Sequence, residues 1–338
     1  MAPIEAGVRI LLGLLPVFSF LVVLILLDSY KLVRPQWVVR LIAAGALAAA
    51  ASLYLNGAIL DHTEIDKGWL VRIIAPAIEE LLKGAVIIVL LVRHRIGFLV
   101  DAAIFGFAVG AGFALVENPG YFLILEDRSL ALWVVRGFGT AVMHGGVTAI
   151  FAMISKTLAD RHGGVRAWVF LPGFLVAWTL HSIFNNFFFS PYLSTALILA
   201  VLPVFFITVF HLSERRTRDW LGVGFDTDAE LLELIGEGRI SESRIGAYLE
   251  ELRERFPPTT VADMLCLLRL RAELSIRAKG VLLARKAGFA IPPDPEMDER
   301  LAEIEYLEQA IGPTGLLSLH PVRHMSDREL WQINALAR

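Results

Sequence analysis

Three ionisable side chains lie near the middle of an apolar stretch that is long enough to cross a bilayer. Residues 69–92 read WLVRIIAPAIEELLKGAVIIVLLV, with Glu79, Glu80 and Lys83 at the centre. Each charge in the middle of a membrane helix costs about 3 kcal/mol, whereas a Leu or Ile returns only about 0.5 kcal/mol. Such groups must face protein, water or one another. Carboxylates held in that way can act as general bases on water.

Helical geometry decides which of these groups can pair. Lys83 follows Glu80 by three residues and Glu79 by four, so its ammonium can reach back to either carboxylate. The two glutamates diverge by about 100° around the helix. We predict that one carboxylate takes Lys83 as its charge partner while the other projects into a cavity. The alternative is a buried ion triad that only fixes packing.

Three further apolar stretches carry polar groups. Glu117 lies in GFAVGAGFALVENPGYF, where the following NPG predicts the end of a helix, and His144 lies in GTAVMHGGVTAIF. His181 and Asn185 share one face of WTLHSIFNNFFF. Taken singly, these residues have simpler explanations: an interfacial position for Glu117, and packing or interhelical hydrogen bonds for the others. Their occurrence on separate helices favours a functional site, because intramembrane ionisable residues are rare.

The composition is that of an integral membrane protein. Of the 338 residues, 56% are hydrophobic and 19% are charged, against about 25% charged in soluble domains. A span needs about 20 mainly apolar residues. Seven windows qualify: residues 8–27, 37–57, 69–92, 97–118, 130–154, 166–189 and 193–212. The first lacks the basic start and the cleavage site of a signal peptide, so we interpret it as a span.

Loops rich in lysine and arginine alternate with acidic or uncharged loops between these windows. Basic residues predominate after the first, third, fifth and seventh windows, whereas the loops after the second, fourth and sixth are acidic or uncharged. Basic loops lie on the cytoplasmic side by the positive-inside rule. The N-terminus is therefore predicted outside and the C-terminus in the cytoplasm.

We expect an all-α fold with two domains. Residues 1–212 should form a polytopic transmembrane helix bundle of about seven spans. From about residue 213 the charge rises, and AYLEELRERF and DERLAEIEYLEQA have helical periodicity. Residues 213–338 should therefore form a soluble, cytoplasmic helical domain. Its sequence contains no catalytic spacing, which favours a regulatory or docking role.

Other features concern packing and partners. Gly106, Gly110 and Gly112 predict a small-residue face for close helix packing. The single cysteine, Cys266, excludes an internal disulfide. No basic stripe of the kind that binds nucleic acid is present. The expected partners are the lipid bilayer and a membrane-anchored protein substrate, and no pattern sets an oligomeric state.

Four motifs follow one another along the chain: EELLK at 79–83, FALVEN at 113–118, MHGGV at 143–147 and HSIFN at 181–185. This ordered set resembles the PrsW family of polytopic intramembrane peptidases, with CAAX prenyl endopeptidases and bacteriocin-processing enzymes as more distant relatives. The resemblance covers roughly residues 60–190. It implies an endopeptidase that hydrolyses membrane-anchored proteins within or at the edge of the membrane, and it points to a prokaryotic plasma membrane.

Carried over to this chain, the resemblance implies a division of roles. Glu79 would be the general base on a water, and Glu80 would assist or orient that water. His144 and His181 would complete the polar centre. Asn185 would donate to the developing oxyanion, where a well-aimed donor is worth several kcal/mol in acyl transfer.

Two mechanisms remain. In the first, His144, His181 and a carboxylate from Glu117 or Glu80 bind zinc with an open water position, since two histidines and a glutamate form a known catalytic zinc set. In the second, Glu79 and a histidine activate water without a metal. The distant relatives have histidine at the position of Glu117, which leaves its role open. We favour zinc, because two imidazoles with converging carboxylates make a strong site.

Two other classes of function compete with proteolysis. Carboxylates and histidines inside a helix bundle also suit a transporter or a proton-coupled channel. An inverted symmetry between the two halves would favour transport, and none is evident in the sequence. The other class is a non-catalytic membrane scaffold whose soluble domain binds partners.

Overall fold

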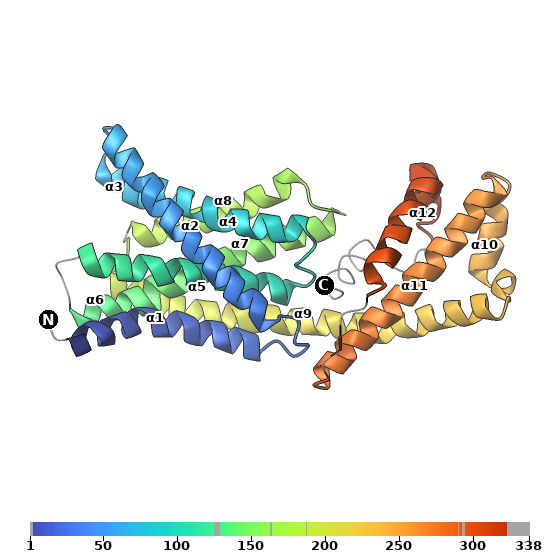
Figure 1. The fold of residues 1–338 in the computed structure, drawn as a ribbon, viewed down its shortest axis with the longest axis horizontal. Coiled ribbons are helices and arrows are strands. Elements are labelled where there is room, and N and C mark those ends of the chain that lie inside the picture. The colour runs from blue at the N-terminus through green and yellow to red at the C-terminus, as the bar shows by residue number, and fades with distance from the viewer. Residues whose placement is uncertain are drawn as a thin grey trace. The chain divides into compact units, whose positions relative to one another are not determined.

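The chain folds into helices that form two compact units (Figure 1). The computed structural model describes residues 3–124, 129–162, 164–186, 188–289, 291–292 and 295–322. Within these ranges every regular element is a helix and none is a strand. The all-α expectation is therefore confirmed for the described residues. The first unit comprises Met1–Ser213, and the second comprises Glu214–Arg338.

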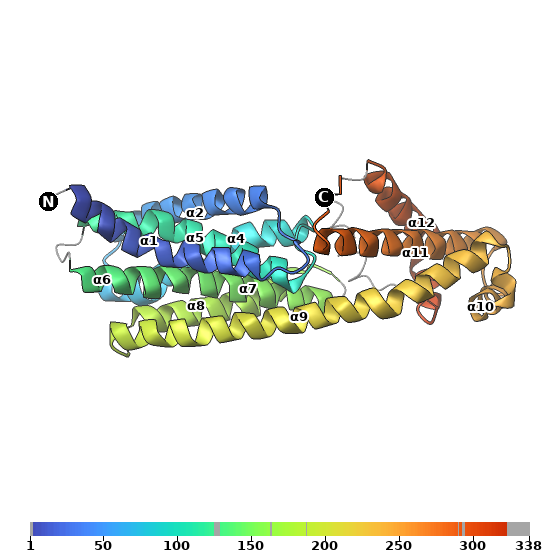
Figure 2. The same ribbon diagram turned by 90° about the horizontal axis from the view of Figure 1, so that it is seen from below.

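The first unit is a bundle of long helices, several of them broken into shorter elements (Figures 1 and 2). In chain order they are α1 (Pro3–Leu26), α2 (Pro35–His62), α3 (Lys67–Trp69), η1 (Leu70–Ile74), α4 (Ala75–Val92), α5 (Leu99–Ile124), α6 (Leu130–Val134), η2 (Val135–Ala141), α7 (Val142–Arg161), η3 (Ala167–Phe170), α8 (Leu171–Asn185) and α9 (Pro191–Gly236). Figure 1 shows α2 crossing α5, and the two helices are in contact.

Among the described residues, six helices are long and apolar enough to cross a membrane, and they correspond to six of the seven predicted windows. The remaining window, residues 69–92, contains α4, which carries Glu79, Glu80 and Lys83. These three charges lie within an 18-residue helix that is otherwise apolar. Accordingly, α4 packs against α2, α5, α7 and α8, so that its charged face meets protein. The count of seven spans stays a prediction.

Two of the long helices contain a π-helical segment, in which each turn holds one extra residue. In the first, α3 continues through η1 into α4, and in the second, α6 continues through η2 into α7. Such π segments are often found at functional sites, because the extra residue changes the direction of the side chains around it. Both lie just before residues of interest, since Glu79 follows η1 by five residues and His144 follows η2 by three.

The predicted helix end after Glu117 is wrong. The helix α5 continues through Pro119 to Ile124. Proline lacks an N–H and its ring crowds the carbonyl oxygen four residues before it, but a membrane helix tolerates both effects when neighbouring helices supply other contacts. Here the adjacent Asn118 provides such contacts, because its amide donates to the carbonyl oxygen of Gly13 in α1 at 2.8 Å.

Helices α5 and α7 form the core of the first unit. Within an apolar 18-residue window of the spans that contain them, 83% and 78% of the residues are buried, against at most 39% in the corresponding windows of the other candidate spans. Their backbones touch because two glycines of α5 lie at the contact: Gly106 faces Ala149, and Gly110 faces His144 and Gly145. Without side chains at these points the two helices approach closely enough to present His144 beside α4.

The second unit contains the C-terminal part of α9 and four further elements: η4 (Ile240–Glu242), α10 (Arg244–Leu252), α11 (Pro258–Lys286) and α12 (Met297–Ser318), which is kinked at Gly312. Apolar side chains such as Met264, Leu267 and Ile304 form its core. A buried ion pair joins Lys279 of α11 to Asp228 at 2.8 Å.

The close contact of α5 with α7 predicts that Gly110→Ala destabilises the first unit. A Cβ atom at this position would lie 2.2 Å from the carbonyl oxygen of His144, so the backbones must separate. Overpacking of this kind costs about 1–3 kcal/mol. We expect a lower midpoint of thermal unfolding for the purified protein in detergent.

Gly57→Ala in α2 is the matched control, because nothing lies within 4 Å of a Cβ atom there and alanine favours a helix. Equal unfolding midpoints for the two variants would contradict the predicted contact.

Candidate active site

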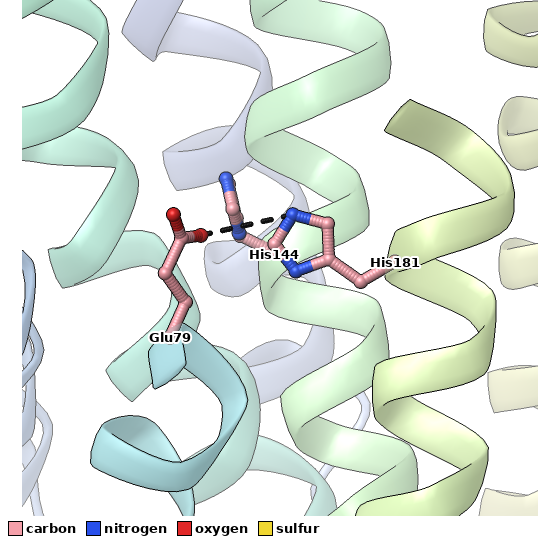
Figure 3. Close-up of side chains that lie close together, drawn as sticks. All are labelled: Glu79, His144 and His181. Atoms are coloured by element: carbon pink, nitrogen blue, oxygen red, sulfur yellow. Dashed lines mark ion pairs between the residues drawn. The ribbon is translucent and has the colours of Figure 1, made fainter. Parts of the chain in front are cut away.

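Three polar side chains from three helices converge in the interior of the first unit (Figure 3). They are Glu79 of α4, His144 of α7 and His181 of α8, and all three are buried. Each offers one ligand atom, and these atoms lie within 4.8 Å of one another. Figure 3 shows the Glu79 carboxylate directed at the His181 ring, with 3.7 Å between Oε2 and Nε2. The three ligand atoms converge closely enough that they could hold a metal ion.

Glu80 lies beside this group and has two partners. Its Oε1 atom accepts a hydrogen bond from the Lys83 ammonium at 2.5 Å and another from Nδ1 of His181 at 2.7 Å. The predicted pairing of one glutamate with Lys83 therefore involves Glu80. The bond to Nδ1 fixes the orientation of the His181 ring and leaves Nε2 directed at Glu79.

His144 is held at both ring nitrogens. Nε2 lies 2.7 Å from Oε2 of Glu117, and Nδ1 lies 3.1 Å from the Lys83 ammonium. Because an ammonium group can only donate, Nδ1 accepts and Nε2–H donates to the carboxylate. The His144 and His181 rings meet nearly at right angles, with 4.8 Å between their centroids.

Glu117 is held in turn by Arg136 of η2, with 3.6 Å between Oε1 and Nη2. The guanidinium group of Arg136 also donates to the side-chain oxygen of Asn118 at 3.0 Å and lies over the Tyr121 ring at 3.8 Å. Arg136 was not among the site residues predicted from the sequence. An available signal was that it is a cation within an apolar window, eight residues before His144.

The charges of these residues do not balance. The site contains the carboxylates of Glu79, Glu80 and Glu117 and the cations of Lys83 and Arg136, so one negative charge has no counterpart when the histidines are neutral. The excess falls on Glu79. Its Oε2 atom is buried and has no hydrogen-bond partner. A buried carboxylate oxygen in that state favours the binding of a cation or a proton.

The residues proposed from the sequence thus occupy different places. The predicted zinc ligands were Glu80, Glu117, His144 and His181, whereas the convergent group contains Glu79 with the two histidines. Glu80 and Glu117 each support one histidine instead. Asn185 lies outside the group, and its amide donates to the carbonyl oxygen of Val71 at 3.1 Å.

An apolar cavity of about 290 Å³ lies next to the site, between α7, α8 and α9. Its lining includes Met143 and Leu180, each of which precedes one of the histidines by one residue. The lining also includes Val147 and Phe184, one helical turn after the two histidines, but none of the three convergent side chains. The cavity is therefore distinct from the polar group.

A bundle of apolar helices that encloses convergent carboxylates and histidines has the architecture needed for hydrolysis inside a bilayer. The family model described as PrsW family intramembrane metalloprotease matches residues 34–212, which is more than half of the chain. The chain belongs to this family, as the sequence motifs predicted. It is accordingly an integral membrane protein of a protease family. No curated protein and no solved structure matches it significantly.

Proposed function

We propose that this protein is an endopeptidase that cleaves membrane-anchored proteins at the Glu79, His144 and His181 group. The observation that carries the proposal is the buried Oε2 atom of Glu79, which has no hydrogen-bond partner and faces Nε2 of His181. In the reaction the oxygen of a water adds to the amide carbon, the C–N bond breaks, and the two protons of the water end on the new carboxyl and amine products. The site must therefore orient the water and take up its proton.

A zinc ion fits these residues. Glu79 offers an unpartnered carboxylate oxygen, and His181 offers Nε2. His144 would bind through Nδ1 after exchange of Lys83, which keeps Glu80 as its partner. Glutamate with two histidines is a known catalytic zinc set, and the ion supplies a water that ionises near neutral pH together with polarisation of the substrate carbonyl.

The surrounding carboxylates suit supporting roles. Glu80 accepts from Nδ1 of His181, and Glu117 accepts from Nε2 of His144. A carboxylate behind a metal-binding histidine fixes the ring and raises its basicity. Lys83 offsets the charge of Glu80, which lets two adjacent glutamates remain buried.

Without a metal, the same atoms support the second mechanism. Oε2 of Glu79 would then accept the proton of the water directly, with His181 orienting it. Membership of a protease family favours proteolysis over the transporter and scaffold alternatives.

The charge pattern of the loops supports an orientation with the N-terminus outside and the second unit, as a soluble domain, in the cytoplasm, and the family resemblance points to a prokaryotic plasma membrane. In keeping with that pattern, Arg95 after α4 lies over the ring of Trp37 at the start of α2, so two of the basic loops share one end of the bundle. With this orientation the substrate is cut towards its extracytoplasmic side.

Glu79→Gln should abolish cleavage while the protein still folds, because the amide cannot take up a proton and is a poor metal ligand. Loss of a general base costs about 10²–10⁴-fold in rate. The measurement uses a reporter library of single-pass membrane segments, from which the wild-type protein first selects a cleaved member. Glu64→Gln, at an exposed glutamate before α3, is the control and should keep the wild-type rate. Wild-type cleavage by Glu79→Gln would rule out the proposed site.

Purified protein should contain one zinc ion per chain by metal analysis, and His181→Ala should lose it because Nε2 is a ligand. Chelation should stop cleavage, and added zinc should restore it. Full activity in a preparation verified as zinc-free would instead establish the mechanism in which Glu79 and His181 activate the water without a metal.

The single cysteine of the chain tests the orientation directly. Cys266 is exposed in the second unit, so a membrane-impermeant maleimide should label it only after the cells are permeabilised. In a Cys266→Ala background, Glu64→Cys should be labelled in intact cells, because the loop before α3 is predicted outside. Labelling of Cys266 in intact cells would reverse the proposed topology.

A further inference from the structure

The π-helical segment η1 leaves one backbone oxygen without its usual donor. At its end the N–H of Ala75 bonds to the carbonyl oxygen of Leu70, five residues back. The next bond in this pattern would join residue 76 to Val71. Residue 76 is proline, which has no N–H to donate. The Val71 oxygen therefore needs a donor from outside its own helix.

Helix α8 supplies that donor and a second one. The side-chain amide of Asn185 donates to the Val71 oxygen at 3.1 Å. The indole N–H of Trp178 donates to the Ile73 oxygen at 2.9 Å. The two residues flank His181, Trp178 three positions before it and Asn185 four positions after it, so all three lie on one face of α8.

These two bonds combine with the bond from His181 to Glu80 into a three-point attachment of α8 to the η1–α4 segment. A slip of one residue along a helix moves a side chain by about 1.5 Å and turns it by about 100°. Such a slip would remove Glu79 from His181. The backbone attachment therefore fixes the relative position of two helices that each contribute to the site.

We propose that Asn185 and Trp178 are positioning residues, which hold the η1–α4 segment in register with α8 and so keep Glu79 opposite His181. The inference rests on the proposed function for its catalytic consequence. It differs from the oxyanion role that the sequence motif implied for Asn185, because the amide acts on the enzyme backbone instead of the substrate. Trp178, which has no counterpart in the oxyanion role, acts in the same way.

A double-mutant cycle between Asn185→Ala and Pro76→Ala tests the proposal. Alanine at 76 restores the missing N–H, so Val71 no longer depends on Asn185. Asn185→Ala alone should lower kcat by about 10²-fold, the effect of a 1 Å misplacement in an active site, with little change in KM. In the Pro76→Ala background the same change should cost far less. An oxyanion donor would be equally necessary in both backgrounds, and an equal loss would overturn the proposal.

The control is Asn186→Ala. Asn186 carries the same amide one residue further on, but it donates within its own helix to the carbonyl oxygen of Ser182 at 2.7 Å. We expect its kcat to match that of the wild type. A loss equal to that of Asn185→Ala would mean that any disturbance at the end of α8 reduces activity, which would also overturn the proposal.

Thermal unfolding of the same variants separates this proposal from the proposed function. Asn185→Ala leaves the Val71 oxygen without a donor and should lower the unfolding midpoint, and Pro76→Ala should reduce that shift, whether or not the protein cleaves any reporter. Suppose that Pro76→Ala reduces the shift in unfolding midpoint but that neither the wild type nor any variant cleaves a reporter. The attachment of α8 to η1 is then supported, and the proposed function fails.

Trp178→Phe provides a second test if Pro76→Ala does not accumulate in the membrane. Phenylalanine keeps an aromatic ring but removes the donor to Ile73. We expect lower kcat, unchanged KM and a lower unfolding midpoint. Wild-type values of kcat and of the unfolding midpoint would refute the role of Trp178 and with it the three-point attachment.

Discussion

A charge inside an apolar helix bundle is tolerated only when another group offsets it, and the core of this protein follows from that constraint. Polar contacts run from α5 and η2 through α7 and α4 to α8, in the order Arg136, Glu117, His144, Lys83, Glu80 and His181. Each residue forms a hydrogen bond or an ion pair with the next one, so the helices that carry them are joined by polar contacts as well as by packing. The contacts that join these helices are therefore also the contacts that build the site.

Glu79 is the exception in this network. Its Oε2 atom is buried without a hydrogen-bond donor, although the neighbouring Glu80 has two. The difference arises because Lys83 can offset only one of two adjacent carboxylates, and the one it takes also reaches His181. The Oε2 atom of Glu79 is therefore left without a partner, and binding of a cation or a proton would stabilise it. A hydrolytic site needs that property, and it agrees with membership of an intramembrane metalloprotease family.

The backbone also helps to position the site. Gly110 allows α5 to touch α7 at His144, and the π segments η1 and η2 precede Glu79 and His144 along the chain. Pro76 and the extra residue of η1 leave the Val71 oxygen without an intrahelical donor, and Asn185 of α8 donates to it, while Trp178 of α8 donates to the Ile73 oxygen. Departures from regular α-helix thus lie where two helices must meet in one register.

The sequence by itself determined the membrane class, the all-helical fold and the order of the four motifs, because apolar length and helical spacing are local properties. It also predicted that Lys83 would pair with one of the two glutamates. Only the tertiary structure decided which glutamate pairs, that Arg136 supports Glu117, that Asn185 meets Val71 and that α5 continues past Pro119. Helical periodicity tells which residues share a face, but which helix that face meets depends on packing between segments far apart in the chain.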